Sequence, residues 1–416
     1  MKKLLYLLPC ICWFLSCQPD DDVDIIYEEG SNEYINQWMY EQMERYYYWN
    51  TSLPKHVDLA LTPQEYLSRL LHVDDPFSYC YHPSMAETFP QSLRRTYGFD
   101  VGFKEHEGNM YAVVLYTLSG SPAQNAGLFR GALIKTINGT PLSKTNSQQI
   151  YTHLLNSDQA DLEFVTYTEA NGFTATQQLS IFKSFTIDQP IESTVIETAG
   201  KKIGYVSFSH FDVGMANSFM GVFTNFKSKQ VSEVVLDLRY NGGGDVASAA
   251  ALCAILVPGA SYNDVFIKFV GNQNGGTIYQ NFQEAIEMNE LQVGFAQLRS
   301  AHPNINRVFV LCGNHTASAS EIVINNLKPY MQVITIGKKT AGKDVAGFTI
   351  EDERNPNERG WVLYPSIYKL FNANQEGNYA TGITPNHVLD ELESLELKPL
   401  GNPSEALLKK ALSTMN

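Results

Sequence analysis

The chain has few positive charges, few cysteines and, beyond its first residues, no long apolar run. Its 30 lysines and arginines stand against 44 aspartates and glutamates, which gives a formal net charge of −14. Nucleic-acid binding needs a basic surface that neutralises phosphates, so this charge argues against that class of protein. After residue 16, no run reaches the roughly 20 apolar residues of a transmembrane helix. Nine scattered histidines show no metal-ligand spacing, and we expect neither a metal nor another cofactor.

The rest of the composition is that of a globular protein. The hydrophobic content of 44% and the aromatic content of 12% exclude a disordered or fibrous chain. At roughly 100–200 residues per domain, the 416 residues predict two to four domains. No internal repeat or low-complexity tract is present.

Residues 1–16 have the marks of a secretion signal. Two lysines precede an apolar run that is too short to span a bilayer and that ends in a small residue. The segment Phe14-Leu15-Ser16-Cys17 resembles a bacterial lipobox, whose cysteine is lipidated and becomes the new N-terminus. We expect lipidation at Cys17, and simple cleavage with an unmodified Cys17 is the alternative.

Residues 17–30 are rich in aspartate and predict a solvated, self-repelling tether. Together with the lipobox, this tether predicts an outer-membrane lipoprotein that is held to the membrane by its lipid and faces the periplasm or the cell surface. The mature chain keeps Cys80, Cys253 and Cys312, which allow at most one disulfide. The last two lie in apolar runs and are expected in the core.

The next two regions differ in their periodicity. In residues 31–90, aromatic residues and methionines recur every three or four positions from Tyr34 to Tyr46, which predicts a small helical N-terminal domain. In residues 91–185, short β-type runs such as Met110–Tyr116 are separated by turn residues and predict a β-rich domain.

Part of this β-rich region resembles a PDZ domain. The run from Ser121 to Gly139 has a short helix begun by a proline, a glycine stop, a strand and an Asn-Gly hairpin turn. In PDZ domains, a loop like Tyr97-Gly98-Phe99-Asp100 offers backbone N–H groups to the terminal carboxylate of a peptide, which then adds as a strand. The resemblance therefore implies protein or peptide partners with a free C-terminus.

Residues 186–395 alternate between strand-like and helical runs. Lys202–Phe208 and Arg307–Cys312 are expected as strands, and Val246–Leu256 is expected as a helix. Such alternation predicts an α/β layered domain. In the last segment, residues 396–416, a C-terminal helix is expected at Pro403–Leu412.

A strand at Val234–Leu238 leads into three successive glycines. The segment reads Asp237-Leu238-Arg239-Tyr240-Asn241-Gly242-Gly243-Gly244. Glycines let the backbone turn sharply and present its N–H groups, which can bind a phosphate or stabilise an oxyanion. A tight strand-to-helix turn with no chemistry explains this segment equally well.

A second segment opens a helix with the residues Thr316-Ala317-Ser318-Ala319-Ser320-Glu321. A serine at a helix start lies in a positive potential beside unpaired N–H groups, which would favour an attacking alkoxide. Ser318 and Glu321 also have the spacing of a capping box, which needs no chemistry. On this segment alone, the cap is the favoured interpretation.

A third segment, Thr340-Ala341-Gly342-Lys343, follows an expected strand at Val333–Ile336. An isolated lysine is usually a solvated surface charge. It can act as a base only if burial lowers its pKa from about 10.4 toward ~7–8.

Together, the three segments resemble the carboxyl-terminal processing peptidases, also called tail-specific proteases. The family pattern is a D-L-R-x-N-x-G-G turn, an S/T-A-S-A-S-E helix start and a T-x-G-K strand exit. The resemblance covers most of the mature chain, because Asp75-Pro76-Phe77-Ser78, the PDZ-like region and Gly382-Ile383-Thr384-Pro385 have counterparts in the same order. It implies a multidomain α/β protein whose third domain has the layered, ClpP/crotonase-like peptidase fold.

The resemblance also implies a role for each site residue. Ser318 is the nucleophile of a lipid-anchored serine endopeptidase that cleaves proteins near their C-termini, and Lys343, 25 positions later, is the base. The oxyanion is held by the N–H groups of Ala319 and of Gly243, with Gly242 as the alternative. The supporting residues are Thr340, Glu321, Arg239 and Asn241.

One position departs from the family. Many of these peptidases have a glutamine four residues after the lysine, where this chain has Gly347. Another residue must then hold Lys343, and Thr340 is one candidate. The main alternative is accordingly a peptide- or ligand-binding lipoprotein on the same scaffold, with a weak or inert dyad.

Two further interpretations are disfavoured. The stretch from Gly337 to Asp344 is close to a P-loop, but Asp344 stands where that motif needs a serine or threonine for magnesium. His315 lies three residues before Ser318, and we interpret it as a loop histidine at the rim of the cleft.

Overall fold

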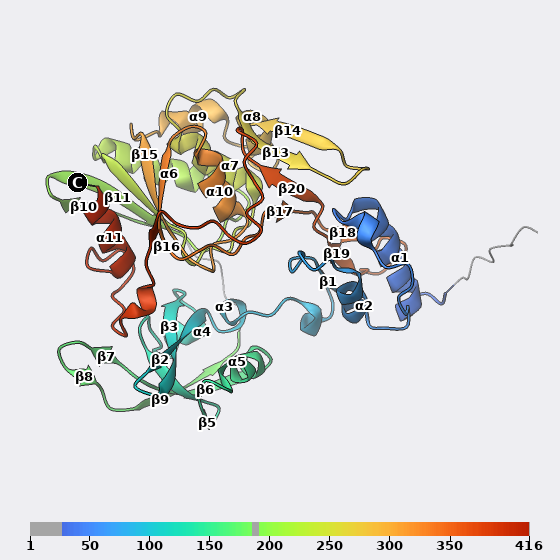
Figure 1. The fold of residues 1–416 in the computed structure, drawn as a ribbon, viewed down its shortest axis with the longest axis horizontal. Helices are drawn as coiled ribbons and strands as arrows, with labels where there is room; N and C mark the ends of the chain where they lie inside the picture. The colour runs from blue at the N-terminus through green and yellow to red at the C-terminus, as the bar shows by residue number, and fades with distance from the viewer. Residues whose placement is uncertain (1–26, 185–190, 416) are drawn as a thin grey trace, which may run out of the picture.

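The structure is a computed structural model that describes residues 27–184 and 191–415. The predicted signal peptide, most of the tether and the lipidation of Cys17 lie outside the described residues and stay predictions. An α/β domain forms one end of the molecule, a β-rich domain lies below it and the N-terminal helices lie to one side (Figure 1). Within the two described ranges, none of the helices is both long and apolar enough for a bilayer crossing.

The N-terminal region is built on two helices. Its elements are α1 (Asn32–Tyr46), η1 (Asn50–Ser52), α2 (Pro63–Leu70), β1 (Tyr79–Tyr81) and η2 (Ala86–Thr88). The methionines of α1 are buried as the helical spacing predicts, and α2 begins with a capping box between Thr62 and Glu65.

The N-terminal region is completed by a segment from much later in the chain. The short strand β1 pairs with β19 (Val362–Tyr364), which also pairs with β18 (Ile350–Glu351). Trp361 and Leu363 complete the hydrophobic cluster of the two helices. Figure 1 shows β18 and β19 beside α1 and α2. Sequence reasoning placed residues 350–364 within the peptidase domain, because pairing across more than 280 residues leaves no local pattern.

The β-rich domain is an antiparallel sheet with short helices. Its elements are α3 (Leu93–Thr96), β2 (Phe99–His106), β3 (Asn109–Thr117), α4 (Pro122–Asn125), β4 (Leu133–Ile137), β5 (Thr140–Pro141), α5 (Ser147–Leu155), β6 (Gln159–Val165), β7 (Tyr167–Thr168), β8 (Gly172–Phe173) and β9 (Gln177–Phe182). The strand order is β2-β3-β4-β6-β9, so β2 is an edge strand. Asn138 and Gly139, with φ of 48° and 74°, form the predicted hairpin turn between β4 and β5.

The α/β domain contains the main sheet. Its remaining elements are β10 (Glu192–Thr198), β11 (Lys201–Ser207), α6 (Ala216–Ser228), β12 (Glu233–Asp237), α7 (Val246–Leu256), β13 (Val265–Val270), β14 (Thr277–Asn281), α8 (Phe282–Glu287), α9 (Phe295–Ser300), β15 (Arg307–Cys312), α10 (Ala319–Leu327), β16 (Gln332–Gly337), β17 (Val345–Ala346), β20 (Tyr368–Phe371), β21 (His387–Val388), η3 (Glu391–Glu393) and α11 (Ala406–Thr414). The main sheet has the order β10-β11-β12-β15-β16-β21 and is parallel from β11 onward. A second sheet has the order β14-β13-β20-β17. The alternation of strands and helices predicted this layered α/β domain.

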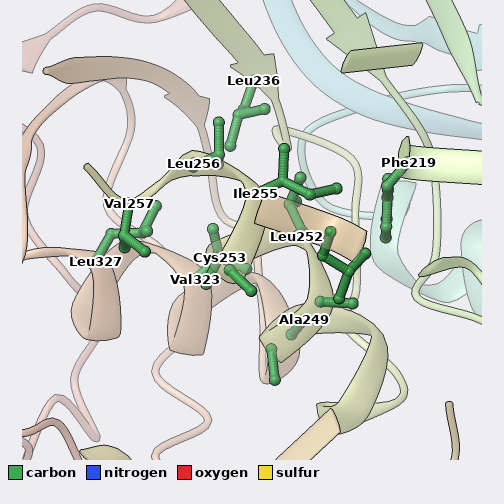
Figure 2. Close-up of a cluster of buried hydrophobic side chains, with 14 of the residues drawn as sticks. Phe219, Leu236, Ala249, Leu252, Cys253, Ile255, Leu256, Val257, Val323 and Leu327 are labelled. Atoms are coloured by element: carbon green, nitrogen blue, oxygen red, sulfur yellow. The ribbon is translucent and has the colours of Figure 1, made fainter. Parts of the chain in front are cut away.

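Helix α7 is the centre of the largest core. It is apolar on all sides and almost entirely buried, which is typical of a helix enclosed by other elements. Figure 2 shows its side chains with Phe219 of α6, Leu236 of β12 and Val323 of α10. Cys253 and Cys312 are buried as expected, and with Cys80 they are the free cysteines of the described chain. Leu407 and Leu408 of α11 pack in a separate cluster with Val235 and Phe309 of the main sheet.

The parallel strands bring the three predicted site segments to one edge of the main sheet. Strands β12, β15 and β16 are neighbours, and each leads at its carboxyl end into one of these segments. Leu238 N–H donates to Leu311 O at 2.9 Å, and Lys338 N–H donates to Cys312 O at 3.0 Å, so pairing continues to the end of the strands. Ligand sites of parallel α/β sheets lie at this edge.

Candidate active site

Ser318 immediately precedes α10 and has an unusual backbone conformation. Its φ of 54° and ψ of −118° are strained for a residue with a side chain, and such strain concentrates at functional sites. Its hydroxyl makes no capping hydrogen bond to the helix. Glu321 does accept the Ser318 N–H, at 2.9 Å. The helix start is therefore stabilised through Glu321, and the Ser318 Oγ is not used as a cap.

Glu321 joins Ser318 to Lys343. Its Oε2 accepts the backbone N–H of Ser318 at 2.9 Å and the backbone N–H of Lys343 at 2.8 Å. Two nitrogens bonded to one oxygen at these distances are at most 5.7 Å apart. The structure thus brings together two residues that are 25 positions apart in the sequence.

The other carboxylate oxygen of Glu321 is also fully used. Oε1 accepts Thr340 Oγ1 at 2.5 Å and the Gly342 N–H at 2.7 Å. Burial raises the pKa of Glu321, while these hydrogen bonds act in the opposite direction. Thr340 in turn accepts the Ile383 N–H at 2.6 Å. Thr340 therefore holds Glu321, and the residue that holds the Lys343 ammonium group has to be sought elsewhere.

The Lys343 side chain ends near two aromatic rings. Its Nζ lies 5.6 Å from the ring centroid of Phe77 and 5.2 Å from that of Tyr364. Burial lowers the pKa of Lys343, and the negative charges of Asp75 and Glu321 only partly oppose this shift. A lowered pKa is the condition that a lysine must meet to act as a base. Sequence reasoning missed Tyr364, for which there is no local signal, and it included Phe77 only as part of a motif.

The glycine turn packs directly on the serine loop. Gly243 has a φ of +95°, and a Cβ on it would lie 2.6 Å from Ser318 Cβ and 2.8 Å from Ala319 N. Asn241 holds the turn, because its Oδ1 accepts Ser320 Oγ at 2.9 Å and its backbone oxygen accepts the Ala317 N–H at 3.2 Å.

One part of the oxyanion prediction needs correction. The Gly243 N–H donates to Asn241 Oδ1 at 2.9 Å and is therefore already bonded. Gly242, the alternative, is exposed, and nothing lies within 4 Å of the place where its Cβ would be. Ala319 is the first residue of α10, so its N–H has no acceptor in a preceding helical turn. Gly242 and Ala319 remain the candidates for the two donors.

Arg239 is part of a buried ion network behind the glycine turn. It makes paired hydrogen bonds to Asp237, at 2.9 and 2.9 Å, and to Glu405, at 2.6 and 2.8 Å. Its Nη1 also contacts Glu391 at 3.1 Å. Burial alone would raise the pKa of Glu391, but Arg239 and Arg130 hold it down to about 2. Arg239 thus links the turn to α11 and to the β-rich domain, which contributes Arg130.

The predicted peptide-binding loop is only partly free. The N–H groups of Tyr97 and Gly98 both donate to Leu93 O, at 2.8 and 2.9 Å, so these two donors are already bonded. The rings of Tyr97 and Phe99 are buried in the core of the β-rich domain. Within the predicted loop, the N–H groups of Tyr97 and Gly98 are therefore already used, and the binding of a peptide by this loop stays a prediction.

Asp100 faces the α/β domain. Its Oδ1 accepts the Val101 N–H at 2.8 Å, and its Oδ2 lies 3.7 Å from His315 Nδ1. A cavity of about 390 Å³ lies here, with β2, α5 and the loop that contains His315 among its walls. His315 lies in a turn, as predicted, and its contact with Asp100 places it where the two domains meet. Within residues 27–184 and 191–415, no group of three or more histidine, cysteine, aspartate or glutamate side chains could hold a metal.

Two protein families match parts of the chain. Residues 202–389 match Peptidase family S41, and residues 34–79 match the Peptidase S41 N-terminal domain. A solved chain of Bacteroides fragilis NCTC 9343, described as an S41 protease, is 28% identical with a TM-score of 0.73. That similarity covers 91% of this chain and 96% of the other. The photosystem II D1 C-terminal processing protease shares the fold, at 19% identity and a TM-score of 0.51, over 86% of this chain and 93% of its own.

Curated relatives point to the same family. The chain is 26% identical to the chloroplastic C-terminal processing peptidase of Tetradesmus obliquus, over 67% of this chain and 58% of that protein. It is 23% identical to the carboxy-terminal processing protease CtpA of Bacillus subtilis, over 83% of this chain and 66% of CtpA. The chain thus spans less than two thirds of these relatives. With its family matches, its fold and its relatives in agreement, the chain belongs to peptidase family S41.

Proposed function

We propose that this protein is a serine endopeptidase that cleaves proteins near their C-termini through a Ser318–Lys343 dyad. The observation that carries the proposal is that Glu321 Oε2 accepts the backbone N–H groups of both residues, which holds their backbone nitrogens within 5.7 Å of each other. The strained backbone of Ser318 and the lowered pKa of Lys343 support the same assignment. The names of the relatives support the substrate class.

The proposed reaction runs in two halves. Neutral Lys343 takes the proton of Ser318 Oγ while that oxygen bonds to the substrate carbonyl carbon. The N–H groups of Ala319 and Gly242 stabilise the resulting oxyanion. The carbon–nitrogen bond then breaks, and the Lys343 ammonium group gives its proton to the leaving amine. Water attacks the acyl-enzyme with Lys343 again as base, and this step releases the acid and restores Ser318.

The dyad is tested by three variants on a fluorogenic peptide with a free C-terminus. Ser318→Ala and Lys343→Arg should each abolish hydrolysis, the second because arginine stays charged at every accessible pH. Lys339→Ala is the matched control, since Lys339 is an exposed lysine four residues earlier. Hydrolysis that persists in both Ser318→Ala and Lys343→Arg would exclude the dyad. A comparison of protein C-termini in cells with wild-type enzyme and with Lys343→Ala would then identify natural substrates.

For the β-rich domain we propose a PDZ-like role in capturing substrate tails. Support comes from β2, an edge strand that lines the cavity together with Gln148 and Tyr151 of α5. A peptide that adds to the β2 edge would enter this cavity and approach the loop that contains His315. The test compares the binding of one peptide with a free and with an amidated C-terminus. Equal affinity for both would contradict this role.

For the N-terminus we propose cleavage before Cys17, lipidation of this residue and attachment to the outer membrane. The support is the segment Phe14-Leu15-Ser16-Cys17 and the acidic residues that follow. Labelled palmitate should be incorporated into the wild-type protein and not into Cys17→Ser. Labelling that survives this substitution would contradict the assignment.

A binding protein with an inert dyad is the second candidate. Two observations favour it: position 347 is a glycine, and the Gly243 N–H already has an acceptor. This candidate requires that wild-type protein binds peptides with free C-termini but hydrolyses none of them. Hydrolysis that depends on Ser318 excludes it.

A further inference from the structure

Position 347 has no room for a side chain. A Cβ on Gly347 would lie 2.0 Å from Pro365 O, which is far inside van der Waals contact. The same Cβ would lie 3.4 Å from Cε1 of Tyr364. The Gly347 N–H donates to Tyr364 Oη at 3.3 Å. Tyr364 thus lies against the backbone of Gly347.

The rings of Tyr364 and Phe77 both border the Lys343 ammonium group, and we call the site formed by these two rings the slot. Both ring centroids are within 5.6 Å of Lys343 Nζ. Asp75 connects the two segments that carry these rings. Its Oδ1 accepts the Phe77 N–H at 3.0 Å and Ser366 Oγ, two residues after Tyr364, at 2.9 Å. The slot is therefore assembled from the N-terminal region, which supplies Phe77, and from β19, which supplies Tyr364.

A ring stack holds Tyr364 in place. Tyr364 is the register partner of Tyr79 in the β1–β19 pair. The two rings are 5.1 Å apart and inclined by only 14°. Tyr79 also stacks on Tyr81, at 6.2 Å. The orientation of Tyr364 thus depends on tertiary pairing that is complete only when the N-terminal region is docked.

We propose that Tyr364, together with Phe77, is the positioning residue for Lys343, and that the absence of a side chain at Gly347 lets Tyr364 lie against the backbone there. The inference rests on the proposed function, in which Lys343 is the base. The two rings confine the Lys343 side chain and keep water away from its Nζ. The N-terminal region thereby becomes part of the active site, because it supplies Phe77 and supports Tyr364.

The electrostatic balance around Lys343 decides the direction of the test. Asp75, from the segment before β1, and Glu321, from α10, favour the charged ammonium, as do the ring faces through cation–π attraction. Exclusion of water favours the neutral amine, and this effect prevails because the pKa of Lys343 is lowered. Burial also raises the pKa of Tyr364, so its phenol stays neutral near pH 7 and adds no charge. Removal of the Tyr364 ring should therefore admit water and raise the pKa of Lys343.

The experiment compares Tyr364→Leu with Tyr364→Phe. The leucine variant loses the ring, and the acid limb of its kcat/KM profile should move to higher pH. At pH 7, kcat should fall about tenfold for each pH unit by which the limb moves, with little change in KM. The phenylalanine variant keeps the ring and should retain the wild-type limb. Phe348→Leu is the matched control, since it removes an exposed aromatic ring that lies beside Gly347 in the sequence and contacts Tyr46 outside this stack. Phe77→Leu removes the other ring of the slot and should also move the acid limb of the kcat/KM profile to higher pH.

A measurement that needs no catalysis separates this inference from the proposed function. In the Ser318→Ala background, the Lys343 Cε signal is titrated by ¹³C NMR with and without Tyr364→Leu, and assigned by its loss in Lys343→Arg. A higher pKa in the Tyr364→Leu protein supports the slot. An unchanged pKa in folded Tyr364→Leu and Phe77→Leu proteins overturns the inference and leaves the dyad intact. If Tyr364→Leu does not fold, Phe77→Leu alone decides. Persistent hydrolysis by Ser318→Ala would reject the proposed function and not the slot.

Discussion

Gly243 lies so close to Ser318 that a Cβ on the glycine would stand 2.6 Å from the Cβ of the serine. The backbone of the glycine turn after β12 thus packs against the side chain of Ser318, at the helix start after β15. This contact explains why a residue without a side chain is needed there, independently of any role for its N–H group. It also makes the position of Ser318 depend on the glycine turn, which gives the first prediction.

Gly243→Ala should nearly abolish activity. Its φ of +95° and the contact with Ser318 make any side chain strained, at about 1–3 kcal/mol in the free energy of unfolding. A displacement of Ser318 by about 1 Å should lower kcat by about 10²-fold. The measurement is peptide hydrolysis together with thermal unfolding. Gly242→Ala is the control, because nothing lies within 4 Å of its Cβ position and its N–H is kept. Equal losses in both variants would contradict this argument.

Glu321→Gln should disconnect the dyad. The Glu321 carboxylate accepts four hydrogen bonds, two on each oxygen. The glutamine amide has only one oxygen, so two of the four donors would face its NH₂ group. Each stranded donor should lower the free energy of unfolding by about 1–3 kcal/mol. We expect a loss in kcat of about 10²-fold, measured with KM by steady-state kinetics. Thr340→Val removes one donor and leaves the carboxylate, so a larger loss in that variant would speak against Glu321 as the link.

Lys343→Met should stabilise the fold while it removes activity. The pKa of Lys343 in the folded protein lies below its value in the unfolded chain, so the ammonium charge is favoured more in the unfolded chain. Above the unfolded-state pKa, the lysine is neutral in both states and this penalty is absent. As pH falls from the unfolded-state pKa toward the folded-state pKa, the wild-type protein loses about 1.4 kcal/mol of stability for each pH unit. Chemical denaturation at pH 7 and above pH 10.5, the unperturbed lysine pKa, should show a gain for Lys343→Met only at pH 7. Lys339→Met, at an exposed position, should show no such gain.

Glu391→Gln should lower the stability of the protein near neutral pH and make its stability less dependent on pH in acid. The charges of Arg239 and Arg130 overcome the effect of burial and hold the pKa of Glu391 at about 2, below the 4.5 of an unperturbed glutamate. Its contribution to stability is therefore present above pH 4.5 and is lost as pH falls toward 2. We expect the free energy of unfolding to vary less over this window in the variant, by roughly 3 kcal/mol. Glu393→Gln is the control on the same short helix. Identical pH profiles for wild type and Glu391→Gln would refute the role of this ion network.

Local patterns anticipated the elements that carry the site. The helix at Val246–Leu256 and the strand at Arg307–Cys312 have the predicted bounds, because continuous apolar runs between turn residues depend only on neighbouring residues. The terminal helix was expected at Pro403–Leu412 and runs from Ala406 to Thr414. It begins later because Glu405 caps it by accepting the Leu408 N–H, and the same carboxylate is bound by Arg239 far away in the sequence.

Other features of the site have no local signal. Tyr364 is an aromatic residue in a three-residue strand, and only its pairing with β1 places it beside Lys343. The bonded state of the Gly243 N–H depends on the direction of the Asn241 side chain. The first contact depends on pairing between segments far apart in the chain. The second joins residues only two positions apart, but distant groups direct the Asn241 side chain, because its Nδ2 donates to Phe208 O and its Oδ1 accepts Ser320 Oγ.

The amino-acid sequence by itself determined the strands, the helices and the glycine- and serine-containing segments that follow them, since these depend on short-range apolar periodicity and on backbone preferences. It also determined which residues could serve as nucleophile and base. Only the tertiary structure decided that Glu321 joins their backbones and that the lysine amine lies over the rings of Phe77 and Tyr364. Burial and hydrogen-bond direction set the chemistry of these groups, and both arise only after distant parts of the chain have packed.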